Sequence, residues 1–218
     1  MKVVTSLSIL LLSSRVFGFC LPNTLEFNKT DKDDINNLEN LAEEIRSVFL
    51  PRLGSDEDLV IVFESLSPKV NAEIKKNNNQ LVLELHGGML SHSKMNEDTF
   101  RLLLCHELGH VLGGRPLKSR TGWSSTEGQA DYYSGKECAQ LLGMDETALL
   151  KGALSLTEIY AEVMRESPPR LESYEEVKVE RTNYGYPSVQ CRLQTILAGW
   201  REEPRPTCWF WNNTVPAT

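Results

Sequence analysis

Apolar residues recur every three or four positions through most of the second half of the chain and again near its start. This spacing places them on one face of an α-helix. Most of these stretches are bounded by a proline or a glycine, as helices usually are. The stretches that predict helices are 31–50, 96–112, 126–143, 146–166 and 187–200. The polar stretches between 167 and 185 and beyond 200 predict irregular structure.

The hydrophobic period changes between the first two predicted helices. Residues 58–65 and 81–86 are short apolar runs bounded by polar turns, which is typical of strands. Residues 69–76 alternate weakly and predict one more strand. A helix, a small antiparallel or mixed sheet and then several helices follow one another without a repeat or a long linker. This order predicts an α+β fold with a mostly helical C-terminal part.

Composition limits the possible partners of the chain. Its 218 residues are 40% hydrophobic and 24% charged, which is enough for one domain with a sizeable core. The formal net charge of −7 argues against nucleic acid or an anionic membrane surface as the main partner, because both need clustered basic residues. No stretch reaches the ~18 apolar residues of a membrane span, so stable membrane insertion is not expected.

The first 18 residues have the pattern of a secretory signal peptide. Lys2 precedes a short apolar run, and Gly18 supplies the small residue at the cleavage point with Val16 two positions before it. The alternative is a buried N-terminal strand or helix. Cleavage predicts a single domain over residues 19–218 and a secreted or periplasmic location.

Export makes the cysteines informative. The chain has five, and an oxidising compartment allows two disulfides and leaves one thiol. No spacing resembles a Cys-x-x-Cys metal or redox site, so structural bridges are expected, with Cys191 and Cys208 as a plausible staple for the C-terminus. The pairing otherwise stays open among Cys20, Cys105, Cys138, Cys191 and Cys208.

The main chemical signal is His106-Glu107-Leu108-Gly109-His110 on the helix predicted over 96–112. Histidines four positions apart lie on one helical face, so both imidazoles can reach a single Zn²⁺. Glu107 lies beside them and can take a proton from a zinc-activated water without being a ligand. The motif therefore predicts zinc as the cofactor and hydrolysis as the chemistry.

A third ligand must come from elsewhere in the chain. Metzincin sites extend the motif to a glycine and a third histidine; Gly113 fits, but Pro116 stands where the histidine is needed. Glu127 and Asp131 lie one helical turn apart on the next predicted helix. We expect Glu127 as the ligand and Asp131 as the acceptor of a histidine ring N–H, with Asp131 as the alternative ligand. Ser124-x-x-Glu127 also fits a capping box, which would make Glu127 a helix-capping residue.

These segments resemble a known family. The His-Glu-x-x-His motif followed by Glu127-Gly128-Gln129-Ala130-Asp131 is similar to the gluzincin zinc metallopeptidases, most of all the branch of HtpX-like and CAAX-prenyl endopeptidases. The segment Tyr186-Pro187-Ser188-Val189-Gln190-Cys191-Arg192 resembles the His-Pro-Ser-x-x-x-Arg segment of that branch. Two features differ: the membrane-spanning helices of those relatives have no counterpart, and Tyr186 replaces their histidine.

The resemblance implies a zincin-like fold and a peptidase mechanism. In such folds an extended substrate pairs with an edge strand beside the active helix, and we expect Leu81–His86 to be that strand. His106, His110 and Glu127 would hold the metal, and Glu107 would be the general base.

Other residues would complete such a site. Tyr186 or Arg192 would donate to the carbonyl oxygen as it becomes negative. His86 and His92 are not needed as ligands, and we expect them at the surface or in turns; the alternative for His86 is a place in the lining of the cleft.

The function predicted from the sequence is an exported zinc-dependent endopeptidase that acts on peptides or proteins. Two alternatives stay open. One is a secreted binding or inhibitory protein that keeps a zincin fold without turnover, although metal binding alone does not need Glu107. The other is a metal-dependent amidase that acts on cell-wall peptides, which the same residues could support.

Overall fold

The computed structural model describes residues 32–211, so the predicted signal peptide and Cys20 lie outside the described residues. The elements are α1 (Lys32–Phe49), η1 (Leu50–Arg52), β1 (Asp58–Glu64), β2 (Ala72–Asn77), β3 (Gln80–His86), α2 (Gly87–Leu90), α3 (Glu97–Leu112), α4 (Glu127–Tyr133), the π-helical turn η2 (Ser134–Cys138), α5 (Ala139–Leu141), α6 (Glu146–Met164) and α7 (Val189–Trp200). This order confirms the predicted α+β class.

The three strands form a mixed sheet in the order β1-β3-β2. β3 pairs in parallel with β1 and antiparallel with β2. The expectation that Leu81–His86 is the substrate-binding edge strand is therefore wrong, because β3 is hydrogen-bonded on both sides. The edge strand on the side of α3 is β2. A central strand is more completely buried than an edge strand, so its sequence is more continuously apolar. An edge strand such as β2 shows only a weak alternation of apolar and polar residues.

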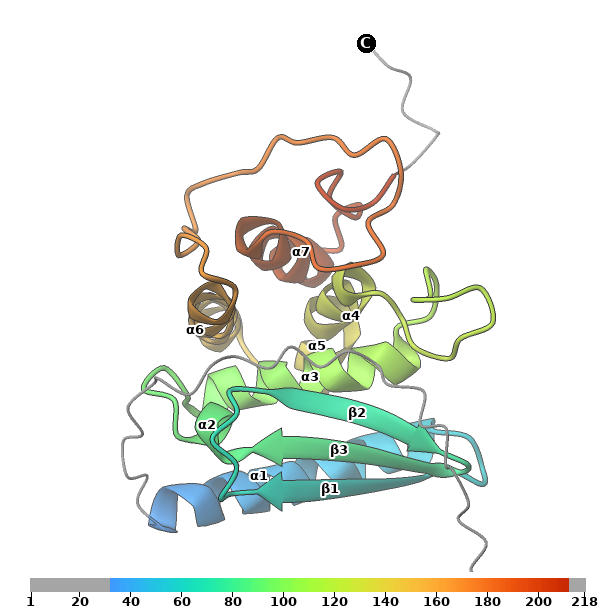
Figure 1. Ribbon diagram of the computed structural model, residues 1–218, viewed down its shortest axis with the longest axis vertical. Helices are drawn as coiled ribbons and strands as arrows, with labels where there is room; N and C mark the ends of the chain where they lie inside the picture. Colours follow the sequence, from blue (N-terminus) through green and yellow to red (C-terminus); the bar gives the residue numbers. More distant parts are fainter. Residues whose placement is uncertain (1–31, 212–218) are drawn as a thin grey trace, which may run out of the picture.

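One face of the sheet supplies much of the core. Leu81, Leu83 and Leu85 of β3 are fully buried and belong to one hydrophobic cluster with Ile45 of α1 and Leu104 of α3. Figure 1 shows α3 alongside β2, with α4, α6 and α7 on the opposite side of α3 from the sheet. α3 packs against both α4 and α6, and α7 packs against the same two helices. The sheet and the helical layer therefore meet along α3.

α3 is buried over most of its length, which makes its polar residues informative. Its N-terminus is capped by Asn96, whose side chain accepts hydrogen bonds from the backbone N–H groups of the first turn. From Leu102 onwards the helix is buried as far as His110. Charged and polar groups are rarely buried without a partner or a function. The three polar residues in this buried stretch are His106, Glu107 and His110.

Two glycines allow unusually close packing around α4. A Cβ on Gly109 of α3 would lie 2.7 Å from the carbonyl oxygen of Ala130, so only glycine lets the two helices approach this closely. A Cβ on Gly128 would lie 2.3 Å from the indole ring of Trp209. Trp209 is itself fully buried and therefore packs directly on the first turn of α4.

Two disulfides join segments that are distant in sequence. Cys105 of α3 is bonded to Cys138 of η2, and Cys191 of α7 is bonded to Cys208. The second bond confirms the expected staple of the C-terminal segment. Among the described residues, no helix combines the length and the apolar character needed to cross a membrane.

Candidate metal centre

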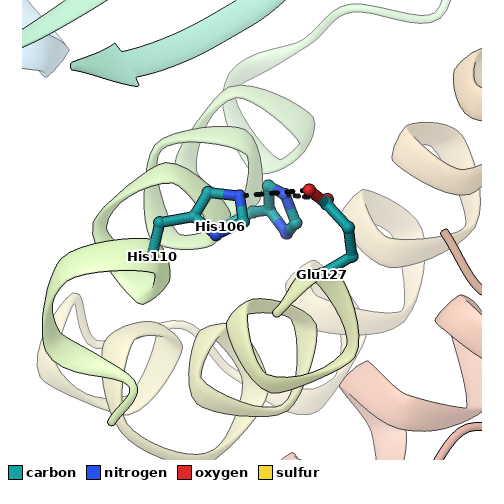
Figure 2. Close-up of side chains that lie close together, drawn as sticks. All are labelled: His106, His110 and Glu127. Carbon is teal, nitrogen blue, oxygen red and sulfur yellow. Dashed lines mark ion pairs between the residues drawn. The ribbon is translucent and has the colours of Figure 1, made fainter. Parts of the chain in front are cut away.

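Three buried donor side chains converge where α3 meets α4. His106 and His110 project from α3, and Glu127 is the first residue of α4. Figure 2 shows the two imidazoles and the carboxylate pointing toward one another. His106 Nε2 lies 3.2 Å from Glu127 Oε2, and His110 Nε2 lies 3.7 Å from Glu127 Oε1. All three residues are at most 5% exposed.

The spacing of these donors suits a tetrahedral metal ion. Ligand atoms at 2.0–2.1 Å from Zn²⁺ are separated by about 3.3 Å in a tetrahedron. The measured separations lie close to this value, and the three donor atoms all lie within 4.8 Å of one another. Two imidazoles and one carboxylate leave one tetrahedral position for water or substrate. The group could therefore bind a metal ion with the coordination of a catalytic site.

The far side of each imidazole is hydrogen-bonded, which fixes its tautomer. His106 Nδ1 lies 2.8 Å from Asp131 Oδ1, and His110 Nδ1 lies 2.9 Å from the carbonyl oxygen of Ser125. Both partners are acceptors, so each Nδ1 carries the proton and donates it. In the neutral form of each ring, Nε2 then faces Glu127 with its lone pair, as in metal-ligating histidines.

α4 begins directly at Glu127, which excludes the capping box proposed for Ser124. The N-cap is Thr126, whose side chain accepts a hydrogen bond from the backbone of Gln129. Ser124 and Ser125 belong instead to the loop before the helix, where Ser125 N donates to the carbonyl oxygen of His110. Glu127 is therefore not the capping-box glutamate of this helix, and its carboxylate faces the imidazoles.

Asp131 is held by a buried arginine as well as by His106. Arg192 of α7 forms two hydrogen bonds with its carboxylate, at 2.7 and 2.9 Å, and its guanidinium stacks 3.9 Å from the ring centre of Tyr160. Arg192 is only 2% exposed. Its Nη2 lies 3.7 Å from Glu127 Oε2. This geometry makes Arg192 a positioning residue for both carboxylates.

The buried charges act strongly on one another. Burial opposes ionisation of Glu127, but His110, His106 and Lys118 hold the pKa of its carboxyl well below the usual range. Burial also opposes protonation of His106, yet the carboxylates of Asp131 and Glu127 raise its pKa to about 9. Burial lowers the pKa of His110 to about 3. The two carboxylates therefore favour a protonated, cationic His106, which lies between them. A metal ion bound by His106, His110 and Glu127 would displace the proton from His106 Nε2.

Glu107 has the properties of a general base. It is 5% exposed, and no basic side chain is hydrogen-bonded to its carboxyl. Burial raises its pKa to about 7, although a hydrogen bond from the Ile74 backbone works in the opposite direction. A base with a pKa near the working pH can both accept and return a proton. The contact with Ile74 places Glu107 beside the edge strand β2.

The donor group opens into a cavity of about 1200 Å³. Its walls come from β2, α3, α6 and the loop between α3 and α4. Tyr186 lines it and is 45% exposed. Burial of the phenol raises its pKa to about 12, so the hydroxyl stays protonated and can donate. The lining combines the polar donors with apolar residues, among them Met89, Leu103 and Val163.

Two residues at the centre have no signal in the sequence. Lys118 Nζ lies 2.7 Å from Glu127 Oε1, but a single lysine in a polar loop fits no motif. Ser125 acts through its backbone carbonyl, which any residue type provides. Comparisons of the chain with protein-family models, with curated proteins and with solved structures found no match.

Proposed function

We propose that this chain is an exported zinc-dependent endopeptidase with a zincin-like fold. The observation that carries the proposal is the buried group of His106, His110 and Glu127, with both histidine tautomers fixed, beside Glu107 and a cavity. Zinc held by these three side chains would polarise a peptide carbonyl and make a water molecule more acidic. The two disulfides fit an extracellular location.

Glu107 performs the proton transfers in this proposal. Its carboxylate accepts a proton from the water whose oxygen adds to the scissile carbonyl carbon. The same carboxyl then returns the proton to the amide nitrogen, and the C–N bond breaks to give a carboxylic acid and an amine. A pKa of about 7 suits both steps near neutral pH.

The edge strand β2 aligns the substrate. Its outer edge lines the cavity, and an extended peptide can add to it as a further strand. The Ile74 backbone contacts Glu107, so a peptide along β2 passes directly beside the general base. Met89, Leu103 and Val163 are among the lining residues, and their apolar side chains suit an apolar substrate side chain.

Tyr186 supplies a hydrogen-bond donor on another wall. Its protonated hydroxyl donates to the carbonyl oxygen as negative charge develops there. Arg192 supports this chemistry indirectly, through Asp131 and Glu127. The similarity of these motifs to the gluzincin branch with HtpX-like and CAAX-prenyl endopeptidases supports the same assignment of roles.

Metal analysis of the purified protein, combined with digestion of a peptide library, tests the proposal. Glu107→Gln removes the base and keeps the three ligands. We expect about one zinc per chain in both proteins and a loss of hydrolysis of about 10²–10⁴-fold in the variant. Glu97→Gln is the matched control, because it makes the same change at an exposed position at the start of the same helix.

The same experiment separates the alternatives. Equal hydrolysis by Glu107→Gln contradicts the mechanism. A wild-type chain that binds zinc and cleaves no peptide is instead a binding or inhibitory protein. Cleavage restricted to cell-wall peptides identifies an amidase.

A further inference from the structure

The loop between α3 and α4 brings a cation to the metal centre. Lys118 Nζ lies 2.7 Å from Glu127 Oε1, the same oxygen that faces His110 Nε2. The lysine side chain is 29% exposed and lines the cavity together with Glu107. Lys118 therefore contacts the donor group on one side and the space available to substrate on the other.

The position of Lys118 is fixed by the backbone of its loop. Lys118 N donates to the carbonyl oxygen of Ser124 at 2.8 Å, and Thr126 N donates to that of Pro116 at 2.9 Å. Leu117 and Ser125 form an isolated antiparallel bridge between these two bonds. The strand-like segment that carries Lys118 is thus paired with the segment that leads into Glu127. Because Ser125 also accepts the proton of His110, one small hairpin orients both the lysine and a donor histidine.

A role in metal binding alone does not account for this lysine. An ammonium group beside a ligand carboxylate repels a divalent cation and draws electron density from the ligand oxygen. Glu127 already has a cation near its other oxygen, because Arg192 Nη2 lies 3.7 Å from Glu127 Oε2. A fixed positive charge at this place becomes favourable when negative charge develops in the cavity, as it does on a carbonyl oxygen under attack.

We propose that Lys118 is a catalytic residue that donates a hydrogen bond to the scissile carbonyl oxygen. As the water oxygen bonds to the carbonyl carbon, the C=O π electrons move to the oxygen, and Lys118 stabilises the resulting charge. No bond to Lys118 forms, and the proton of the water goes to Glu107. An ammonium group has three donors, so the bond to Glu127 leaves donors for substrate. The inference rests on the proposed peptidase function and adds a second donor to the one assigned to Tyr186.

Three variants test the role of Lys118. Lys118→Met keeps a long unbranched side chain and removes the charge, Lys118→Arg restores a charge, and Arg120→Met makes the same loss at an exposed position two residues away. Each protein is measured for zinc content and for kcat and KM on the peptide that the wild type cleaves best. Each is also titrated with an alanine-flanked Phe-Leu peptide in which a phosphinate replaces the scissile amide. The phosphinate is a tetrahedral, negatively charged analogue of the carbonyl after attack.

The catalytic role predicts a specific pattern. In Lys118→Met, kcat falls by about 10²–10³-fold with KM little changed, and affinity for the phosphinate falls while zinc content stays at the wild-type level. Lys118→Arg recovers part of kcat, and Arg120→Met behaves as the wild type does.

Two other results overturn the inference for Lys118 alone. One is an unchanged kcat in Lys118→Met. The other is a fall in kcat that follows a loss of zinc, which would make the lysine a structural partner of Glu127. If instead the wild-type chain binds zinc and cleaves nothing, the proposed function fails and the catalytic role fails with it.

Discussion

The described residues contain two groups of side chains that could hold a metal ion. One lies at the contact of α3 with α4 and consists of His106, His110 and Glu127. The other lies on the sheet and consists of Glu73, Glu84 and His86. In each group the three donor atoms lie within 4.8 Å of one another. On the sheet, Glu73 and Glu84 are register partners across β2 and β3, and His86 lies two residues beyond Glu84 on the same face. Simple spacing of donors therefore does not distinguish the two groups.

The two groups differ in what surrounds the donors. On the sheet, Lys75 Nζ lies 2.6 Å from Glu84 and 3.2 Å from Glu73, so an ammonium group already bridges both carboxylates. Within residues 32–211, neither buried ring nitrogen of His86 has a hydrogen-bond partner that would fix its tautomer, and Nε2 lies 3.8 Å from Glu73 Oε1. At the α3–α4 contact, each Nδ1 donates to an acceptor, and Lys118 contacts a single carboxylate oxygen.

This difference shows what a metal centre needs beyond spacing. Outer partners that hold a tautomer strengthen a histidine ligand, whereas a lysine between two carboxylates competes for the place of the metal. We therefore expect zinc at the α3–α4 group and not at the sheet group.

The largest effect is expected for removal of the carboxylate ligand. Glu127→Ala takes away one of three protein ligands, so zinc affinity should fall by well over the 10–100-fold typical of an outer partner. Glu84→Ala removes a carboxylate from the sheet group and should leave zinc content at about one per chain. Competition titration against a zinc-binding dye measures both. A loss of zinc in Glu84→Ala would break the comparison, since it would place a metal on the sheet.

A smaller effect is expected for the partner of His106. Asp131→Asn keeps the volume and removes the charge that holds the Nδ1 proton, so zinc affinity should fall by about 10–100-fold. Circular dichroism checks that the fold survives, because Arg192 loses its charged partner. If Asp131→Asn loses more zinc than Glu127→Ala, the roles of the two carboxylates are exchanged.

Features with a period or a fixed spacing could be predicted from the sequence. The histidines four positions apart on α3 and the carboxylates four positions apart on α4 follow from helix geometry, as do most helix positions. The α+β class follows from the order of the elements. The pairing of Cys191 with Cys208 agrees with the expectation of a staple for the C-terminal segment.

Features that depend on tertiary contacts could not be predicted. The hydrophobic pattern indicates how deeply a strand is buried but not which strands lie beside it, so it predicts β3 at the edge position that β2 occupies. Lys118 is one lysine in a polar loop, and only the pairing of that loop with Ser124 brings it to Glu127. The sequence predicts His86 at the surface or in a turn; it is the last residue of β3 and is only 5% exposed, because pairing on both sides of β3 is not visible in the local pattern.

The smallest effect concerns the pH dependence contributed by His86. Burial, followed by the charge of Lys69, lowers the pKa of this histidine below 6.5. Above pH 6.5 the imidazole is neutral in both the folded and the unfolded chain, so its titration costs no stability. Below pH 6.5 the unfolded chain binds a proton that the folded chain resists, and stability falls.

Melting curves at pH 7.5 and 5.5 test this, with zinc present at the same concentration for the wild type and for His86→Phe. The wild type should lose more in Tm between the two pH values, by no more than about 2–4 °C, or about 1 kcal/mol in a chain of this size. Equal pH dependence of the two proteins would mean that His86 has a polar partner that holds its charge. If a higher zinc concentration removes the excess loss from the wild type alone, His86 binds the metal. A buried imidazole with carboxylate neighbours and no fixed tautomer would then be enough for a metal centre, and the distinction between the two groups would be wrong.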